Sequence, residues 1–294
     1  SGTWKVTGAA GTGVSSFLID TVIHALDKAR ETGADPSGIL VIAPSKESGA
    51  RLRRELSERL EDYAAQSSMV RSVHSLAFAL LRTAAEEELR LITGAEQDAV
   101  IRELLAGQAE DGHGSWPAEM RPALEYVGFA RQLRDFLLRS IERGLGPDDL
   151  ERLGSEYGRP MWSAAGEFLR EYERVQLLSR SHSYSAAELV TAVLQRPQLL
   201  REHPFHTIIV DDAQLLDPTA GELIRELAPH AQLVVVGGDA DQSVFAFRGA
   251  SSRFLREFPA EHEIELTEPH RTPLPACISI VDSEGRLRDV VANT

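Results

Sequence analysis

A glycine-rich loop near the start of the chain constrains the fold more than any other feature. Gly8, Gly11 and Gly13 separate the short apolar run "WKVTG" from "SSFLIDTVIHALDKARETG", whose apolar residues have helical spacing up to Gly33. A loop of this kind, placed between a strand and a helix, cradles phosphate with its backbone N–H groups. The pattern G-x-x-x-x-G-K-[ST] is matched except for its lysine, which is replaced by Val14. The sequence therefore predicts a phosphate-binding loop that lacks its usual cation.

Further strands and helices alternate along the chain. The run "GILVIAP" is continuously apolar, as a strand buried on both faces should be, and "KESGARLRREL" follows it with helical character. Two more apolar runs, "HTIIVDDAQ" and "AQLVVVGGDADQS", end in acidic residues. This alternation predicts an α/β fold with a parallel sheet, whose strand carboxyl ends bind the ligand.

The middle of the chain, residues 86–185, has a different character. Thr93 and Glu96 form a capping-box pattern ahead of a helical run. The segment "FARQLRDFLLRSI" then places its apolar residues on one helical face, and two more helical segments follow. We therefore expect an all-helical insertion over 86–185 that interrupts a sheet domain made of residues 1–85 and 186–277.

Composition limits the class of protein. The net charge of −14 argues against a protein that coats nucleic acid through bulk charge, although a local basic surface is possible. Lys46, Arg51, Arg53 and Arg54 form such a cluster, for which a solvated helix face is an equal alternative. The single cysteine, Cys277, excludes an intrachain disulfide framework and favours a reducing, cytoplasmic setting. No apolar run is long enough for a membrane span, so we expect no membrane partner.

Two later motifs carry more information than the loop. Asp211 and Asp212 follow a predicted strand, as a Mg²⁺-binding carboxylate and a water-orienting acid would. The stretch "GGDADQSVFAFRGAS" is long and specific, and it resembles a motif of the UvrD/Rep/PcrA class of superfamily 1 DNA helicases. The segments "VIAPSKESGARLRREL", "SVHSLAFALLR" and "LTEPHRTP" resemble other motifs of the same class, in the same order.

This resemblance implies a RecA-like domain 1A with a helical domain 1B inserted in it, ATP and Mg²⁺ as cofactors, and single-stranded DNA as partner. The nucleotide-binding loop would consist of Gly8, Ala9, Ala10, Gly11, Thr12, Gly13, Val14 and Ser15. Ser15 and Asp211 would bind the metal. The catalytic positions would be Asp212, Gln242, Arg248 and Arg271. His74, Phe245 and Phe247 would contact the DNA strand, together with Arg51 of the basic helix.

Several positions depart from the pattern of the family. Val14 has no charge for the β- and γ-phosphates, which should cost about 10²–10³ in rate by analogy with the loss of one transition-state donor. Asp212 stands where the family has Glu, and Pro44 and Val73 replace aromatic residues. We expect impaired ATP hydrolysis. The alternatives are an active motor rescued by Lys5 or Lys46, a kinase-like nucleotide switch, and a purely structural module.

A paired motor is the context that fits an impaired site best. Only three of the 31 Lys and Arg residues are Lys, as in proteins from GC-rich genomes. Both features resemble the AdnA-like subunit of the AdnAB helicase-nucleases, related to AddAB, in which one of two UvrD-like subunits can carry a degraded motor. Residues 278–294 resemble the strand and helix that begin the second RecA-like domain of the family. We therefore expect a fragment of a longer motor, with that domain and a second UvrD-like subunit as partners.

Overall fold

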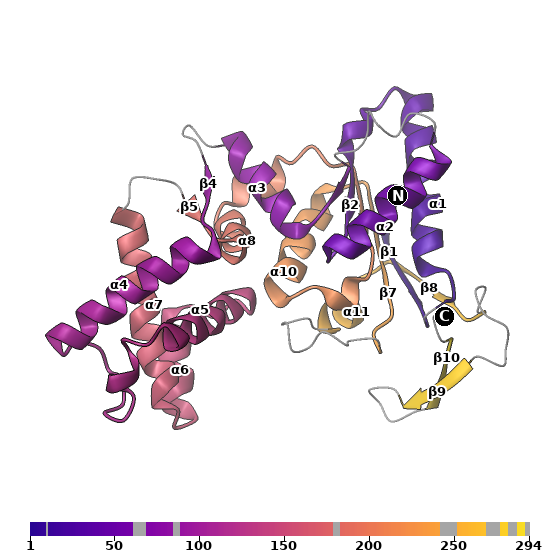
Figure 1. The fold of residues 1–294 in the computed structure, drawn as a ribbon. Helices are drawn as coiled ribbons and strands as arrows, with labels where there is room; N and C mark the ends of the chain where they lie inside the picture. The colour runs from indigo at the N-terminus through magenta and orange to yellow at the C-terminus, as the bar shows by residue number, and fades with distance from the viewer. Residues whose placement is uncertain are drawn as a thin grey trace. The chain divides into compact units, whose positions relative to one another are not determined.

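The chain divides into two compact units, each of which is described by itself. The computed structural model describes residues 1–9, 11–60, 69–84, 89–178, 183–241, 252–268, 277–281 and 287–291 (Figure 1). The first unit comprises Ser1–Ala77 and Arg196–Thr294, and the second comprises Phe78–Gln195. The bounds of domains 1A and 1B given above stay a prediction.

A six-stranded sheet forms the centre of the first unit, in the order β3-β2-β6-β7-β1-β8. Its strands are β1 (Gly2–Gly8), β2 (Ile39–Ile42), β3 (Val70–Arg71), β6 (Thr207–Val210), β7 (Leu233–Gly238) and β8 (His262–Leu266). All of its neighbouring strands are parallel. The predicted α/β fold with a parallel, RecA-like sheet is therefore confirmed.

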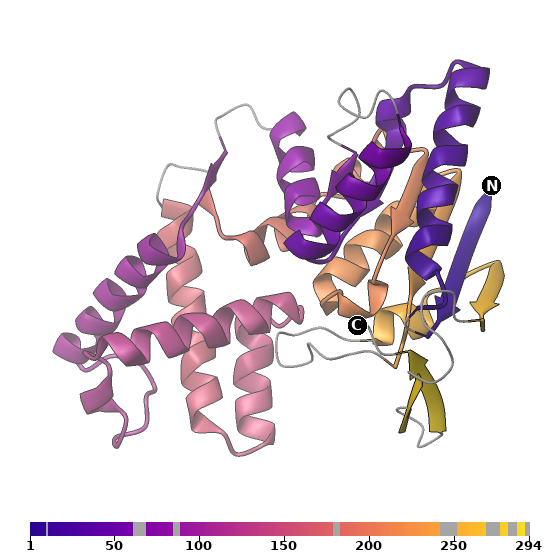
Figure 2. The same cartoon turned by 45° about the vertical axis from the view of Figure 1, so that its right-hand side comes forward.

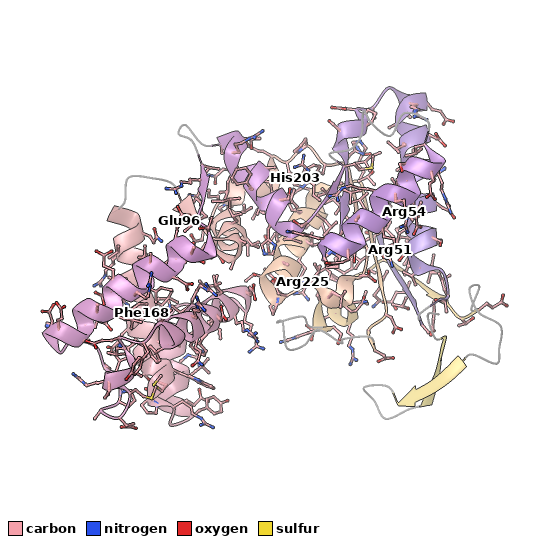
Figure 3. All side chains as sticks on the ribbon, in the orientation of Figure 1. Arg51, Arg54, Glu96, Phe168, His203 and Arg225 are labelled. Carbon is pink, nitrogen blue, oxygen red and sulfur yellow. The ribbon has the colours of Figure 1, made fainter. Side chains whose placement is uncertain are left out.

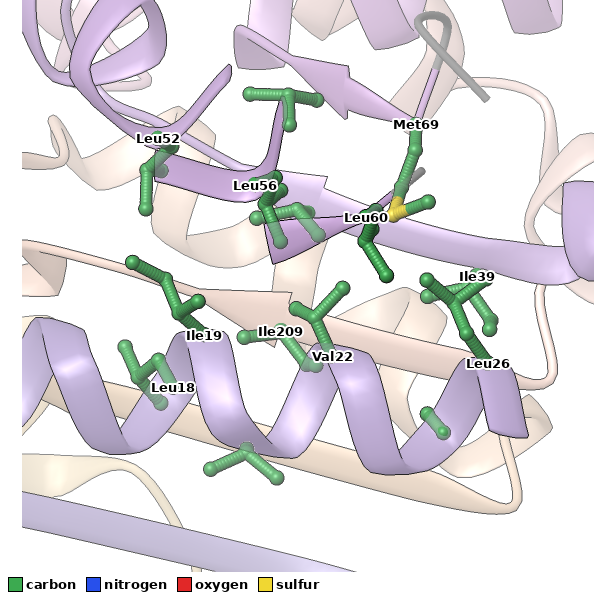
Figure 4. Packing of buried hydrophobic residues seen from close by; sticks show 14 of the residues in the cluster. Leu18, Ile19, Val22, Leu26, Ile39, Leu52, Leu56, Leu60, Met69 and Ile209 are labelled. Carbon is green, nitrogen blue, oxygen red and sulfur yellow. The ribbon is translucent and has the colours of Figure 1, made fainter. Parts of the chain in front are cut away.

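Two helices, α1 (Val14–Thr32) and α2 (Lys46–Arg59), pack on one face of this sheet (Figure 2). Leu18, Ile19, Val22 and Leu26 recur at helical spacing along α1 and are at most 1% exposed. Figure 4 shows these side chains facing Ile39 and Ile209 of the sheet and the leucines of α2. The helix ends at Gly33, as predicted, because the left-handed backbone there (φ 71°) suits a glycine.

The remaining helices of the first unit lie between its strands along the chain, and all of them except η1 belong to the second half of the chain. They are η1 (Pro36–Gly38), α9 (Pro197–Arg201), η4 (Ala213–Leu215), α10 (Pro218–Leu227), η5 (Ala228–His230) and α11 (Arg253–Glu257). The Asp217 side chain caps α10 by accepting from the N–H of Ala220 at 2.8 Å. Leu223, Ile224 and Leu227 of α10 are completely buried. This half of the chain therefore adds its own apolar layer to the unit.

Helices dominate the second unit. They are α4 (Gly94–Asp111), η3 (Arg121–Ala123), α5 (Val127–Glu142), α6 (Pro147–Glu156), α7 (Pro160–Leu178) and α8 (Ala186–Leu194), while α3 (Val73–Ala84) contains the boundary between the units. The predicted capping box is present, since Thr93 Oγ1 accepts from the Glu96 N–H and the Glu96 carboxylate accepts from the Thr93 N–H. Phe168 is 0% exposed at the centre of the helical core.

Three short strand features differ from the sequence expectations. The helical unit also contains a parallel pair, β4 (Arg90–Leu91) with β5 (Ser183–Tyr184), so it is not entirely helical. The edge strand β8 was not predicted, because its mostly exposed residues alternate with charges rather than forming an apolar run. Leu287–Val291 forms β10, antiparallel to β9 (Cys277–Val281), where we expected a helix. The adjacent valines of this segment favour a strand.

Candidate nucleotide site

Three neighbouring strands end at the same edge of the sheet, and the predicted site residues follow them. In the register of the sheet Val210 of β6 lies beside Val236 of β7, and Thr7 of β1 lies beside Gly238 of β7. The glycine-rich loop, Asp211 and Asp239 therefore leave the sheet at its carboxyl edge. In open α/β sheets this edge is where ligands bind.

The loop between β1 and α1 has the backbone of a phosphate cradle. Gly11 (φ 83°) and Gly13 (φ 93°) adopt the left-handed conformation that glycine tolerates best. The buried Thr12 closes the turn, because its hydroxyl donates to the Ala9 carbonyl at 2.7 Å. No side chain caps the first turn of α1, so its N–H groups stay available to an anion. A glycine-rich turn between a strand and a helix is thus present at Gly8, Ala9 and Gly11–Ser15, while Ala10 lies outside the described residues; nucleotide binding by this turn stays a prediction.

Val14 packs toward the sheet rather than into the loop. A Cβ atom built on Gly237 of β7 would lie 3.0 Å from Val14 Cγ1 and 2.7 Å from Leu18 Cδ1. The valine is half-buried against the core formed by α1 and the sheet. The position that carries the lysine in the motif is therefore an apolar packing position in this chain.

A guanidinium group lies against both carboxylates that follow β6. Arg51 of α2 donates through Nη2 to Asp211 Oδ2 at 3.0 Å and to Asp212 Oδ2 at 3.4 Å. The same nitrogen donates to Ser15 Oγ at 3.1 Å, and Ser15 Oγ donates to Asp211 Oδ1 at 3.0 Å. Asp211 is 1% exposed and Arg51 is 36% exposed. We expected Arg51 on the DNA path, and the structure places its guanidinium against Ser15, Asp211 and Asp212.

Asp212 has an unusual backbone. It is the only non-glycine residue in the described part of the chain with a positive φ, 49°. Its carboxylate accepts from the Ser48 hydroxyl at 3.3 Å and from Gln214 Nε2 at 3.5 Å, in addition to Arg51. Strained backbone of this kind concentrates at functional sites, where surrounding contacts hold it. The contacts here hold the second carboxylate beside the first.

Burial, together with the neighbouring Asp212 charge, raises the pKa of Asp211 to about 6, although Arg51 and the Ser15 hydroxyl act in the opposite direction. Near neutral pH the described site therefore holds two carboxylates against one guanidinium. That balance repels a polyphosphate, whereas a lysine and a divalent cation would attract one.

Ser15 and Asp211 have the hard oxygen atoms that Mg²⁺ prefers, so the donor chemistry alone suits the metal. However, the Ser15 and Asp211 oxygens already accept hydrogen bonds from Arg51, and Asp211 also accepts one from the Ser15 hydroxyl. Mg²⁺ needs oxygen ligands at about 2.0–2.1 Å in octahedral geometry, which the guanidinium prevents. Elsewhere in the described ranges no group of three or more His, Cys, Asp or Glu side chains could hold a metal. The residues as arranged do not fit Mg²⁺.

Two other predicted residues, Lys5 as a substitute for the missing lysine and His74 as a DNA contact, lie in the described part of the chain. Lys5 pairs with Glu263 of β8 at 2.6 Å and is therefore engaged at the edge of the sheet. His74 lies on α3, and burial lowers its pKa while Asp217 raises it. The predicted site residues Gln242, Phe245, Phe247, Arg248 and Arg271 lie outside the described residues.

Two further site residues were missed by sequence reasoning. The first is Ser48, whose hydroxyl donates to the Asp212 carboxylate. It lies three residues before Arg51, on the same face of α2. Gln214 is 4% exposed and joins two strand ends, because its Oε1 accepts from the Asp239 N–H at 3.2 Å and its Nε2 donates to Asp212. The sequence signal that could have identified Gln214 as a site residue is its position two residues after the paired aspartates.

Comparisons with known proteins agree with this architecture. The model of the family "UvrD/REP helicase N-terminal domain" matches residues 1–263. Similar curated proteins include DNA helicase II of Salmonella typhimurium, with 24% identity over 96% of this chain and 39% of that protein. The putative ATP-dependent DNA helicase YjcD of Bacillus subtilis is 23% identical over 96% of this chain and 37% of its own length. The ATP-dependent DNA helicase PcrA of Staphylococcus aureus is 23% identical over 91% of this chain and 36% of its own.

The chain thus spans less than two fifths of the length of these relatives. None of the helices in the described part of the chain combines the length and the apolar character needed to cross a bilayer. The matched range covers the phosphate loop, the paired aspartates and the helical unit. The chain belongs to the UvrD/REP helicase N-terminal domain family.

Proposed function

We propose that this chain is the first motor domain of a UvrD-like DNA helicase subunit and that it binds single-stranded DNA while its own ATP hydrolysis is impaired. The observation that carries the proposal is Val14, whose side chain packs against Gly237 where the motif requires a lysine. Without that ammonium the loop lacks the group that contacts the β- and γ-phosphates. A weakened nucleotide site on an otherwise complete parallel sheet fits a strand-guiding role.

The surrounding assembly is part of the proposal. The second RecA-like domain of a UvrD-like motor and a second UvrD-like subunit are the partners that would supply ATP-driven movement. An AdnA-like role in a helicase-nuclease fits the glycine-rich loop with Val14 in place of lysine, and it fits the low lysine content of the chain. Residues 278–294 would lead into the second RecA-like domain.

The DNA path is proposed to include Phe245, Phe247 and His74. Base stacking on an aromatic side chain contributes roughly 1–3 kcal/mol per base and tolerates any sequence. Arg51 is a weaker candidate for this path than the sequence suggested, because its guanidinium contacts Asp211 and Asp212. The strand would then be held by stacking more than by this arginine.

A Phe245→Ala/Phe247→Ala double variant should bind a labelled single-stranded oligonucleotide at least about tenfold more weakly than the native chain, since each lost stacking contact costs roughly 1–3 kcal/mol. Fluorescence anisotropy over a range of salt concentrations measures this loss, and the salt slope should stay the same because no phosphate contact is removed. His262→Ala is the control, because it removes from β8 an exposed ring whose aromatic contact is with Trp4 of β1. Equal affinity of the double variant and the native chain at every salt concentration would contradict the stacking role.

A further inference from the structure

The Arg51 side chain of α2 joins two other segments of the candidate site, the start of α1 and the turn after β6. Arg51 Nη2 is 3.1 Å from Ser15 Oγ at the start of α1, 3.0 Å from Asp211 Oδ2 after β6, and 3.4 Å from Asp212 Oδ2. Two of these three oxygens belong to carboxylates. A point surrounded by such oxygens, at the carboxyl edge of the sheet, is where a cation is most stabilised.

The guanidinium suits this place chemically. It is always protonated, and it carries five N–H donors in a plane, so it can neutralise the buried Asp211 carboxylate without a metal. An unpaired charge on Asp211, which is 1% exposed, would be strongly unfavourable. Arg51 Nε is buried and has no hydrogen-bond partner among the described residues. The guanidinium is therefore held beside the carboxylates by its Nη2 contacts, although its Nε–H donor is unsatisfied.

The helix that carries Arg51 is anchored independently of the site. Leu52 and Leu56 of α2 are at most 1% exposed in the core, and the Ser45 hydroxyl caps the helix by accepting from the Ser48 N–H at 3.0 Å. Ser48 lies on the same face as Arg51 and also contacts Asp212. Figure 3 labels Arg51 and Arg54 on this helix. Arg51 is the one that donates hydrogen bonds to Asp211 and Asp212. The arginine is therefore a fixed part of the site.

We propose that Arg51 is the resident cation of this site: its guanidinium takes the place of the divalent metal between Ser15 and Asp211 and keeps Mg²⁺ out. This inference deepens the proposed function, and it rests on that proposal only in treating the loop as a nucleotide site. The loop and the paired aspartates then hold their arrangement without metal. A nucleotide that enters the site meets one fixed guanidinium charge instead of a mobile divalent ion.

The test measures metal binding by the full chain in the absence of nucleotide and DNA. Isothermal titration with Mn²⁺, used as the probe, and the electron paramagnetic resonance of free Mn²⁺ both report binding directly. Arg51→Ala should bind Mn²⁺ at least about tenfold more tightly than the native chain, because it frees three oxygens and removes the competing charge. Adding Asp211→Asn to Arg51→Ala should abolish the gain, since it removes the main carboxylate ligand.

Arg54→Ala is the matched control, because it removes an exposed guanidinium of the same helix that has no ion pair among the described residues. Its Mn²⁺ affinity should equal that of the native chain. If Arg51→Ala does not fold, as judged by circular dichroism, Arg51→Gln removes the charge and keeps most of the side-chain length. Equal Mn²⁺ binding by the native chain and the folded Arg51 variant, including the absence of binding in both, overturns the proposal. That result would leave the DNA-binding proposal standing, since the oligonucleotide assay tests it separately.

Discussion

A Val14→Lys/Arg51→Ala double variant should bind ATP with Mg²⁺ at least about 30-fold more tightly than the native chain. The new ammonium would reach the phosphates from the first residue of α1, and the freed Ser15 and Asp211 oxygens could accept a metal. A desolvated charge pair of this kind is worth roughly 2–5 kcal/mol, and about 1.4 kcal/mol corresponds to each factor of ten. Calorimetric titration of ATP and Mg²⁺ into each variant measures the gain.

Two controls separate charge from shape in this experiment. Val14→Met/Arg51→Ala introduces a straight side chain at the same half-buried position without the ammonium, so it should lack most of the gain. The two single variants should each gain less than the double variant, because Val14→Lys alone restores only the ammonium and Arg51→Ala alone frees only the metal position. A double variant that binds ATP no more tightly than the native chain would show that something other than Val14 and Arg51 limits the site.

Phe168→Ala should lower the free energy of unfolding of the helical unit by about 3–5 kcal/mol. Phe168 of α7 is 0% exposed, and its ring lies 6.1 Å from that of the buried Trp116. Removing it leaves a cavity that the surrounding helices can fill only in part, which adds to the lost transfer free energy. Guanidinium titration followed by circular dichroism and by hydrogen exchange of the α4–α7 amides measures the loss.

Tyr157→Ala is the control for that measurement, because it removes an aromatic side chain that is 62% exposed in the same unit. It should change stability by less than about 0.5 kcal/mol. A loss below about 1 kcal/mol for Phe168→Ala would mean that the helical core is not organised around this ring. The assignment of residues 86–185 to one packed helical body would then need revision.

Sequence patterns were sufficient to predict those helices and strands whose structure depends mainly on their own residues. Leu18, Val22 and Leu26 follow helical spacing, and Gly33 ends the same helix, so α1 could be predicted with its end. The capping box of Thr93 and Glu96 is likewise a local pattern, and both of its hydrogen bonds are present. Buried parallel strands such as β2 and β6 are continuous apolar runs, which is why the parallel sheet was predictable.

Features that depend on distant segments were not predictable in the same way. In the sequence, Arg51 is one residue of a basic helix face. Its contact with Asp211 joins positions 160 residues apart, which no local pattern indicates. The direction in which α2 presents that side chain is set by the burial of Leu52 and Leu56, which only the packed structure reveals. The edge strand β8 was missed for a related reason: its pairing with β1, rather than its own pattern, makes it a strand.

The charge arrangement at the strand ends has one consequence for nucleotide binding. Val14 supplies no cation, Lys5 pairs with Glu263, and Arg51 pairs with both aspartates. Of these three positions, only Arg51 places a positive side chain at the strand ends, and that guanidinium is paired with both aspartates. Among the described residues, the backbone N–H groups of the loop are then the donors that remain for the phosphates of ATP.

The most direct measurement is calorimetric titration of ATP into the native chain, once with Mg²⁺ and once with a chelator. We expect weak binding that Mg²⁺ does not strengthen, because the guanidinium already lies between Ser15 and Asp211. Tenfold or tighter ATP binding in the presence of Mg²⁺, lost in an Asp211→Asn variant, would contradict it.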